Sequence, residues 1–170
     1  MATVYTLVDS HGAVISAPFS SPQSLSDWPN YVEMDDSDPR YQAWLVQVNC
    51  GRLAAYLGAK QSAVLYQVFS ATLTDGSGMT LTSALDKDSQ AGLNSLTNWA
   101  STPELQVGKP TETYCNADWS SHVVTPAQWL AFAGLVGVRL TSIYTTTSEG
   151  AAGVSAGTIT TTAQIDALPW

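Results

Sequence analysis

Two cysteines and two histidines are the residues of this sequence best suited to nucleophilic or metal chemistry. Cys50 or Cys115 could act as a nucleophile with His122 as its base, but the sequence does not bring either pair together. His11 falls in a run typical of a turn, which favours a solvated side chain. The four residues lack zinc-ligand spacing, and no serine stands in a Gly-x-Ser-x-Gly sequence. We therefore expect a protein that is not an enzyme, with no catalytic residue, metal ligand or cofactor.

The acidic residues suggest two other kinds of chemistry. Residues 35–38 contain three aspartates, but a calcium loop also needs a glycine at its sharp turn and a distal bidentate glutamate, and neither follows. Asp38 followed by Pro39 is instead typical of a helix start, because aspartate caps the first amides and proline suits the first helical position. The carboxylates between residues 86 and 118 show no arrangement suited to glycoside cleavage.

The six tryptophans could serve either packing or binding. Most of them are expected to be core anchors. Trp28, Trp119 or Trp170 could instead form a platform on which a sugar ring stacks, because an aromatic face suits both purposes.

Composition narrows the class of partner. The net charge is −8, and charged residues make up 12% of the chain, about half the usual share. No two of the six lysines and arginines are adjacent, so a nucleic-acid backbone finds no basic patch, and an anionic membrane surface would repel the chain. Serine, threonine, asparagine and glutamine fill the gap, as expected for a surface that packs against neighbours. These features predict an assembly component that does not bind nucleic acid.

Membrane insertion and secretion are not expected. The most apolar run, residues 127–140, is too short and too interrupted to span a bilayer. Residues 1–8 lack the basic leader and apolar core of a signal peptide, which predicts synthesis in a cytoplasm. In such a reducing compartment Cys50 and Cys115 are expected to remain free thiols.

Residues 1–64 form the first of three expected regions. Alternating apolar residues within residues 4–15, around a turn that contains Gly12, predict a hairpin. The helix that starts after Asp38 is expected to break near Gly51, where a second helix over residues 49–60 begins.

Residues 65–144 form the second region, and the clearest local signal in the chain opens its last helix. Thr125 is followed by a proline and, at the third position, by Gln128, which is a capping box. The expected elements are a hairpin (66–83), a helix (89–100), a strand (114–124) and a helix (126–144).

Residues 145–170 form the third region. Threonine, glycine and alanine dominate residues 145–157 and predict a flexible linker, followed by a short terminal element over residues 158–168. The expected fold class is α+β, in which small antiparallel hairpins pack with two to four short helices.

The helix over residues 126–144 is apolar around its whole circumference, which is typical of a helix at the centre of a fold or at a subunit interface. Apolar side chains outside its main stripe are therefore candidates for partner contacts, as are the tryptophans. The expected partner-binding residues are Trp28, Trp44, Leu130, Leu135 and Trp170.

The order of these elements resembles an uncharacterised domain of bacteriophage tail-fibre and tail-fibre-assembly proteins. That resemblance rests on a strand and hairpin centred on Phe69, a capped helix over residues 88–96, a strand with Trp119 and an apolar helix over residues 125–140. The Asp-Pro-Arg-Tyr sequence at residues 38–41 also resembles tail proteins. The threonine- and glycine-rich end departs from the alanine-rich helical ending of the family.

The resemblance implies a non-enzymatic structural component of a phage tail, at the baseplate or tail fibre. Such a protein would be made in the host cytoplasm and reside in the virion, bound to other tail proteins as a homo-oligomer or as part of a larger assembly. Two alternatives remain open at this point. The protein could be a tail-fibre assembly chaperone that is absent from the finished particle, or a module that binds carbohydrate on the host surface.

Overall fold

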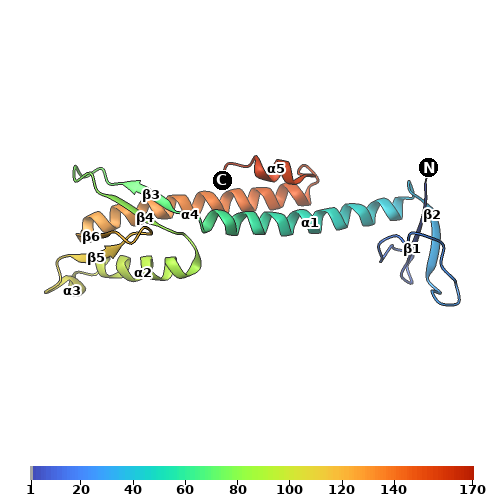
Figure 1. The fold of residues 1–170 in the computed structure, drawn as a ribbon, viewed down its shortest axis with the longest axis horizontal. Helices are drawn as coiled ribbons and strands as arrows, with labels where there is room; N and C mark the ends of the chain where they lie inside the picture. The colour runs from blue at the N-terminus through green and yellow to red at the C-terminus, as the bar shows by residue number, and fades with distance from the viewer. Residues whose placement is uncertain (1) are drawn as a thin grey trace.

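Two long antiparallel helices, α1 (Pro39–Leu65) and α4 (Pro126–Ser155), form the axis of an elongated molecule (Figure 1). The computed structural model describes residues 2–170. Asp38 caps α1, because its Oδ1 accepts a hydrogen bond of 2.8 Å from the amide of Arg40. In the capping box of α4, the Thr125 hydroxyl accepts from the Gln128 amide and the Gln128 side chain accepts from the Thr125 amide. Both predicted helix starts are confirmed.

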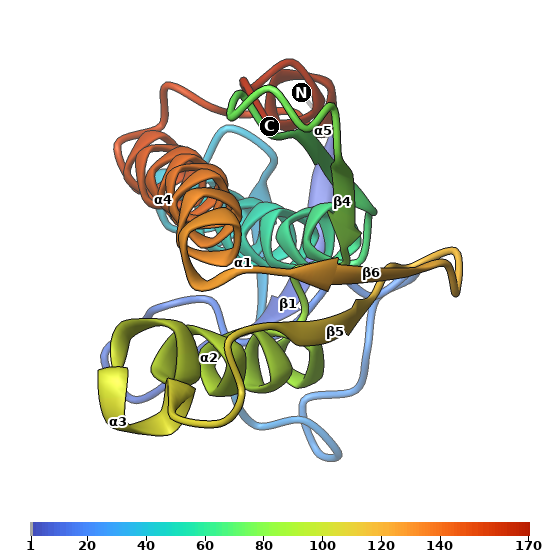
Figure 2. The same ribbon diagram turned by 90° about the vertical axis from the view of Figure 1, so that its left-hand side faces the viewer.

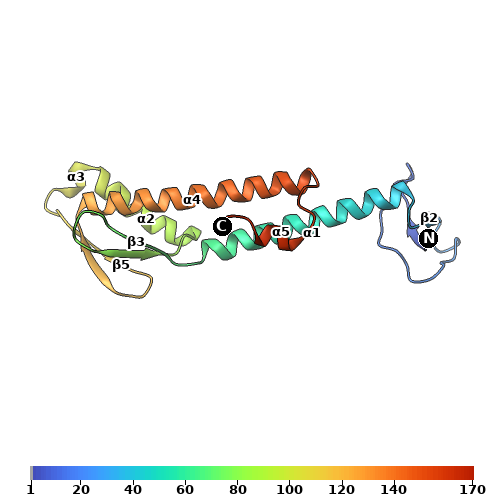
Figure 3. The same cartoon turned by 90° about the horizontal axis from the view of Figure 1, so that it is seen from above.

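Helix α1 is continuous through Gly51, so the predicted break is wrong. One exposed glycine costs a helix only about 1 kcal/mol. The packing of the following turns on α4, through Leu53 and Leu57, offsets that cost. The first turns of α1 extend past the end of α4 and carry the N-terminal strands (Figures 1 and 3).

The N-terminal unit is built on β1 (Thr3–Leu7) and β2 (Tyr31–Asp35), which pair antiparallel. The predicted hairpin is partly correct. Its turn forms, with the Asp9 amide donating to the Ala13 carbonyl and a bridge between Val8 and Val14. However, β1 takes its main partner from β2, beyond the loop.

The opposite end of the molecule packs two hairpins and two helices around the first half of α4 (Figure 2). The core of this head includes Trp129, Phe132 and Leu81, all fully buried. The predicted single strand over residues 114–124 is wrong, because the chain turns back within it and forms two strands. The elements of the head are β3 (Phe69–Thr72), β4 (Thr80–Ser83), α2 (Lys87–Ser101), α3 (Pro103–Gln106), β5 (Glu112–Cys115) and β6 (Ser121–Val124).

The predicted flexible linker over residues 145–157 is also wrong, because α4 continues to Ser155. Thr146, Gly150 and Val154 are buried along this part of α4. Beyond it, α5 (Thr162–Asp166) folds back along α1 and buries Ile165 completely (Figure 3). Packing against α1 and α5 therefore keeps a sequence of low helix propensity in a helix.

Residues 2–170 contain five helices and three two-stranded antiparallel sheets, with 48% helix and 17% strand. The predicted α+β class is confirmed. Two of the helices, with 27 and 30 residues, are far longer than the short helices expected.

Candidate functional site

The residues best suited to catalysis lie apart. Tyr114 of β5 pairs with His122 of β6, and Cys115 pairs with Ser121. Cross-strand partners share a face of a hairpin, while neighbours along a strand point to opposite faces. The Cys115 thiol and the His122 imidazole are therefore on opposite faces. Cys50 is on α1, where its thiol points to the Val154 carbonyl at 3.6 Å. Both cysteines are free.

The acidic run at residues 35–38 forms a turn and a helix cap. Hydrogen bonds from the hydroxyl and amide of Ser37 lower the pKa of the Asp35 carboxyl. Hydrogen bonds from the Arg40 side chain and amide lower the pKa of Asp38 to about 2. Within residues 2–170, no group of three or more histidine, cysteine, aspartate or glutamate side chains could hold a metal ion.

The outer face of α1 is the first candidate interaction surface. Tyr41, Trp44, Val48, Gly51, Ala55, Gly58 and Ser62 recur at alternating intervals of three and four residues and form this outer stripe. The buried residues Leu53, Leu57 and Val64 face α4 from the opposite side of the helix. The rings of Tyr41 and Trp44 stack with centroids 5.9 Å apart.

The outer stripe carries no charge, and part of it lies on the turns of α1 that extend past α4 (Figure 3). Val48 is 48% exposed, and a Cβ built at Gly51 or Gly58 would meet only open space. A neighbouring helix could therefore approach the α1 backbone closely. An exposed helix face without charge is suited to a protein contact rather than to water.

The predicted partner-binding residues fall on separate surfaces. Trp44 lies on the outer stripe, and Leu130 and Leu135 are 41% and 43% exposed on α4. Trp28 packs on Phe19 in the N-terminal loop, with ring centroids 5.4 Å apart. Trp170 packs against both hydrophobic clusters, and its indole donates to the Ile165 carbonyl, so it serves the core of its own chain.

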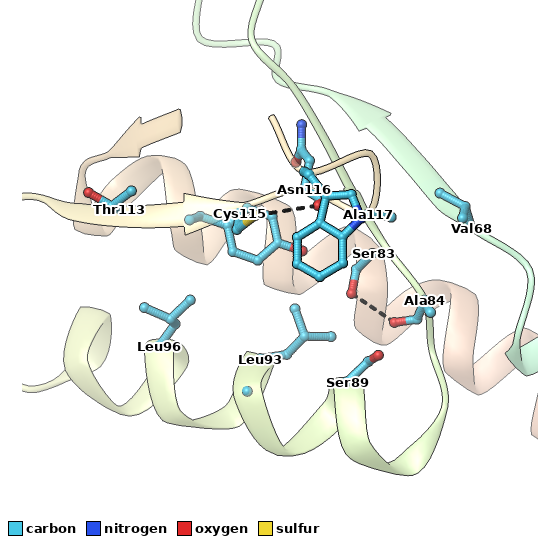
Figure 4. Close-up of a pocket in the computed structure, with 13 residues that line it drawn as sticks. Val68, Ser83, Ala84, Ser89, Leu93, Leu96, Thr113, Cys115, Asn116 and Ala117 are labelled. Atoms are coloured by element: carbon cyan, nitrogen blue, oxygen red, sulfur yellow. Dashed lines mark hydrogen bonds between the residues drawn. The ribbon is translucent and has the colours of Figure 1, made fainter. Parts of the chain in front are cut away.

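An open groove in the head is the second candidate surface, and no pattern in the sequence predicted it. Its volume is about 640 Å³. One wall comes from Ser89, Gly92, Leu93 and Leu96 of α2, and the other from residues 113–117 of β5 and the turn that follows (Figure 4). The groove depends on the β5–β6 hairpin, which replaces the single strand predicted over residues 114–124.

Asn116 holds the hairpin that forms this wall. Its side-chain oxygen accepts from the Thr82 amide at 2.9 Å, and its side-chain nitrogen donates to the Thr80 carbonyl and the Ser120 hydroxyl. The Tyr114 hydroxyl donates to the Thr82 carbonyl at 2.8 Å. These bonds join the β5–β6 hairpin to β4 and fix its position over α2.

Trp119 stands at the mouth of the groove. It is 85% exposed and has a φ of +67°. The Trp119 amide donates to the Asn116 carbonyl, and the Asn116 amide donates to the Ser120 carbonyl. This is a three-residue turn whose last residue is left-handed, a position usually filled by glycine. The turn thus displays a large aromatic side chain at some cost in backbone strain.

No family model, curated protein or solved structure matches the chain. No helix within residues 2–170 combines the length and hydrophobicity needed to cross a membrane.

Proposed function

We propose that the protein is a non-enzymatic structural component of a bacteriophage tail, at the baseplate or tail fibre, that acts through protein–protein contacts. The assignment to a tail rests on the resemblance in sequence. The uncharged outer stripe of α1 carries the proposal that the protein works through contacts. A stripe with this spacing is the pattern by which helices pair, and here it faces away from the chain's own core.

The partner on the outer stripe is a second copy of the chain. A two-fold pair of α1 helices would bury the same outer stripe on both copies, as a symmetric interface requires. Trp44 and Val48 would supply apolar area, and Gly51 and Gly58 would let the two backbones approach. Burial of a valine side chain contributes about 1.5–3 kcal/mol. The elongated shape would leave the head free for other tail proteins (Figure 1).

Light scattering coupled to size-exclusion chromatography tests this contact. The full chain is expected to elute as an oligomer, and Val48→Glu is expected to reduce it to a monomer. Val46→Glu is the matched control, because Val46 is 62% exposed but lies about 200° around the same helix. A monomeric wild-type chain, or equal effects of the two variants, would contradict self-association through the outer stripe.

Mass spectrometry of purified particles tests the assignment to the tail. The chain is expected in the finished particles of a phage that encodes it, at a fixed ratio to other tail proteins. Its absence from such particles would favour an assembly chaperone.

A further inference from the structure

The outer edge of β5 has backbone groups available for pairing. The Asn116 amide bonds to the Ser120 carbonyl, which sets the phase of the ladder between β5 and β6. Hydrogen-bonded and non-hydrogen-bonded pairs alternate along an antiparallel ladder. The backbone N–H and C=O groups of Tyr114 and Glu112 therefore also point toward β6. The peptide groups of Thr113 and Cys115 therefore point away from β6. The Thr113 amide meets only the carboxylate of its own neighbour, Glu112, at 3.2 Å.

The groove runs along this same edge. Residues 113–117 line it without interruption. Successive side chains of a strand point to opposite faces, so consecutive residues share one cavity only where the cavity follows the edge of the strand. Each of the three two-stranded sheets within residues 2–170 leaves edges unpaired. The edge of β5 differs from the others because the groove runs along it.

The opposite wall suits an uncharged chain. Leu93 and Leu96 of α2 point across the groove toward β5 (Figure 4). Between these two leucines and Ser89, Gly92 contributes no side chain to the wall, and a Cβ built there would meet only open space. None of the lining residues is charged. A strand lying beside β5 would have one set of alternate side chains against this apolar wall.

The side chains in the groove leave few polar groups for any other ligand. The Ser83 hydroxyl donates to the Ala84 carbonyl, and the Ser89 hydroxyl donates to Asp86. Asn116 is engaged in three hydrogen bonds with the protein. A sugar needs several free side-chain donors and acceptors, whereas an extended peptide needs the backbone groups of a strand edge.

We propose that this groove binds an extended, uncharged segment of another protein, which adds to β5 as a third strand and places alternate apolar side chains against Leu93 and Leu96. Trp119 would close over one end of the bound segment. The site is in the head, away from the outer stripe of α1, and does not depend on the proposed tail function.

The test uses the full chain and a library of short, end-capped peptides in which apolar and uncharged polar residues alternate, with binding measured by fluorescence anisotropy. Thr113→Pro removes the outward amide of Thr113 while leaving the β6 ladder intact, as proline permits at a strand edge. Thr113→Ala is the matched control. Thermal melting of both variants checks that the hairpin still folds.

Strand addition predicts that Thr113→Pro weakens the best peptide by at least about tenfold, while Thr113→Ala leaves its affinity within about threefold. Methylation of alternate peptide amides is expected to abolish binding in one register and spare it in the other. Equal loss in the two variants, or a library without a binder, would overturn the proposal. So would an oligosaccharide from a glycan array that binds the wild type and is lost with Trp119→Ala.

Discussion

Gly150 of α4 lies directly against Leu57 of α1. A Cβ built at this glycine would stand 2.9 Å from the Leu57 Cδ1 atom and 3.0 Å from the Leu168 Cδ1 atom. The close packing of α1, α4 and the C-terminal segment therefore depends on the missing side chain.

Gly150→Ala is expected to destabilise the protein by about 1 kcal/mol. Overpacking a core costs about 1–3 kcal/mol, and replacing a helical glycine by alanine returns about 0.5–1 kcal/mol. Gly137→Ala, on an open side of the same helix, is expected to stabilise by that smaller amount. Urea unfolding at a fixed protein concentration measures both. Stabilisation by both variants would show that the two helices do not pack as described.

Ile165 tests whether the C-terminal segment is part of the core. It is fully buried, in one cluster with Leu53, Leu57 and Val154. Ile165→Ala is expected to cost about 2–5 kcal/mol of unfolding free energy, as truncation of a buried isoleucine usually does. Val107→Ala, at a highly exposed valine, should stay within about 0.5 kcal/mol of the wild type. If Ile165→Ala lowered the unfolding free energy as little as Val107→Ala does, the C-terminal segment would be only loosely attached.

The starts of the long helices were predictable because caps are local. Asp38 with Pro39, and Thr125 with Gln128, specify a helix start within four residues. The second half of α4 was not predictable in this way. Its threonines, serines and glycines favour a linker by composition, and only contacts distant in sequence hold them helical. One of these is the hydrogen bond from the Thr146 hydroxyl to the Pro169 carbonyl at 3.2 Å.

The two candidate surfaces also differ in how far the sequence predicts them. Although the break expected near Gly51 would have divided the outer stripe, the helical turns that carry Trp44 were predicted. The groove was not, because a three-residue hairpin turn is normally recognised by glycine or asparagine at its left-handed position, and Trp119 occupies it here. Because this turn signal is missing, the sequence predicts neither the hairpin nor the unpaired edge of β5.

The left-handed backbone at Trp119 predicts an unusual order of stability among variants at this position. A left-handed backbone costs an ordinary residue about 1–2 kcal/mol, and most for a β-branched one. Trp119→Gly is expected to be at least as stable as the wild type, because the exposed indole loses little burial. Trp119→Val is expected to be less stable by about 1 kcal/mol. Thermal unfolding ranks the three, and a valine variant as stable as the glycine variant would contradict the left-handed turn.

The lowered pKa of Asp38 predicts that the folded chain loses stability in acid at a specific carboxylate. Hydrogen bonds from the Arg40 side chain and amide lower the pKa of its carboxyl from 3.8 to about 2 in the folded chain. A lowered pKa means that the ionised carboxylate stabilises the folded state. This contribution is fully present above the ordinary pKa near 4 and is lost as the pH falls toward 2.

Asp38→Asn keeps an oxygen that can cap α1 but removes the charge and the ion pair with Arg40. Its unfolding free energy should therefore fall less steeply than that of the wild type between pH 4 and pH 2. The other aspartates with lowered pKa values are common to both proteins, so the difference between the two curves reports the Asp38 charge, including its repulsion of the Asp35 carboxylate. Urea unfolding across this range measures it. Parallel curves would show that Arg40 does not hold the Asp38 carboxylate in solution.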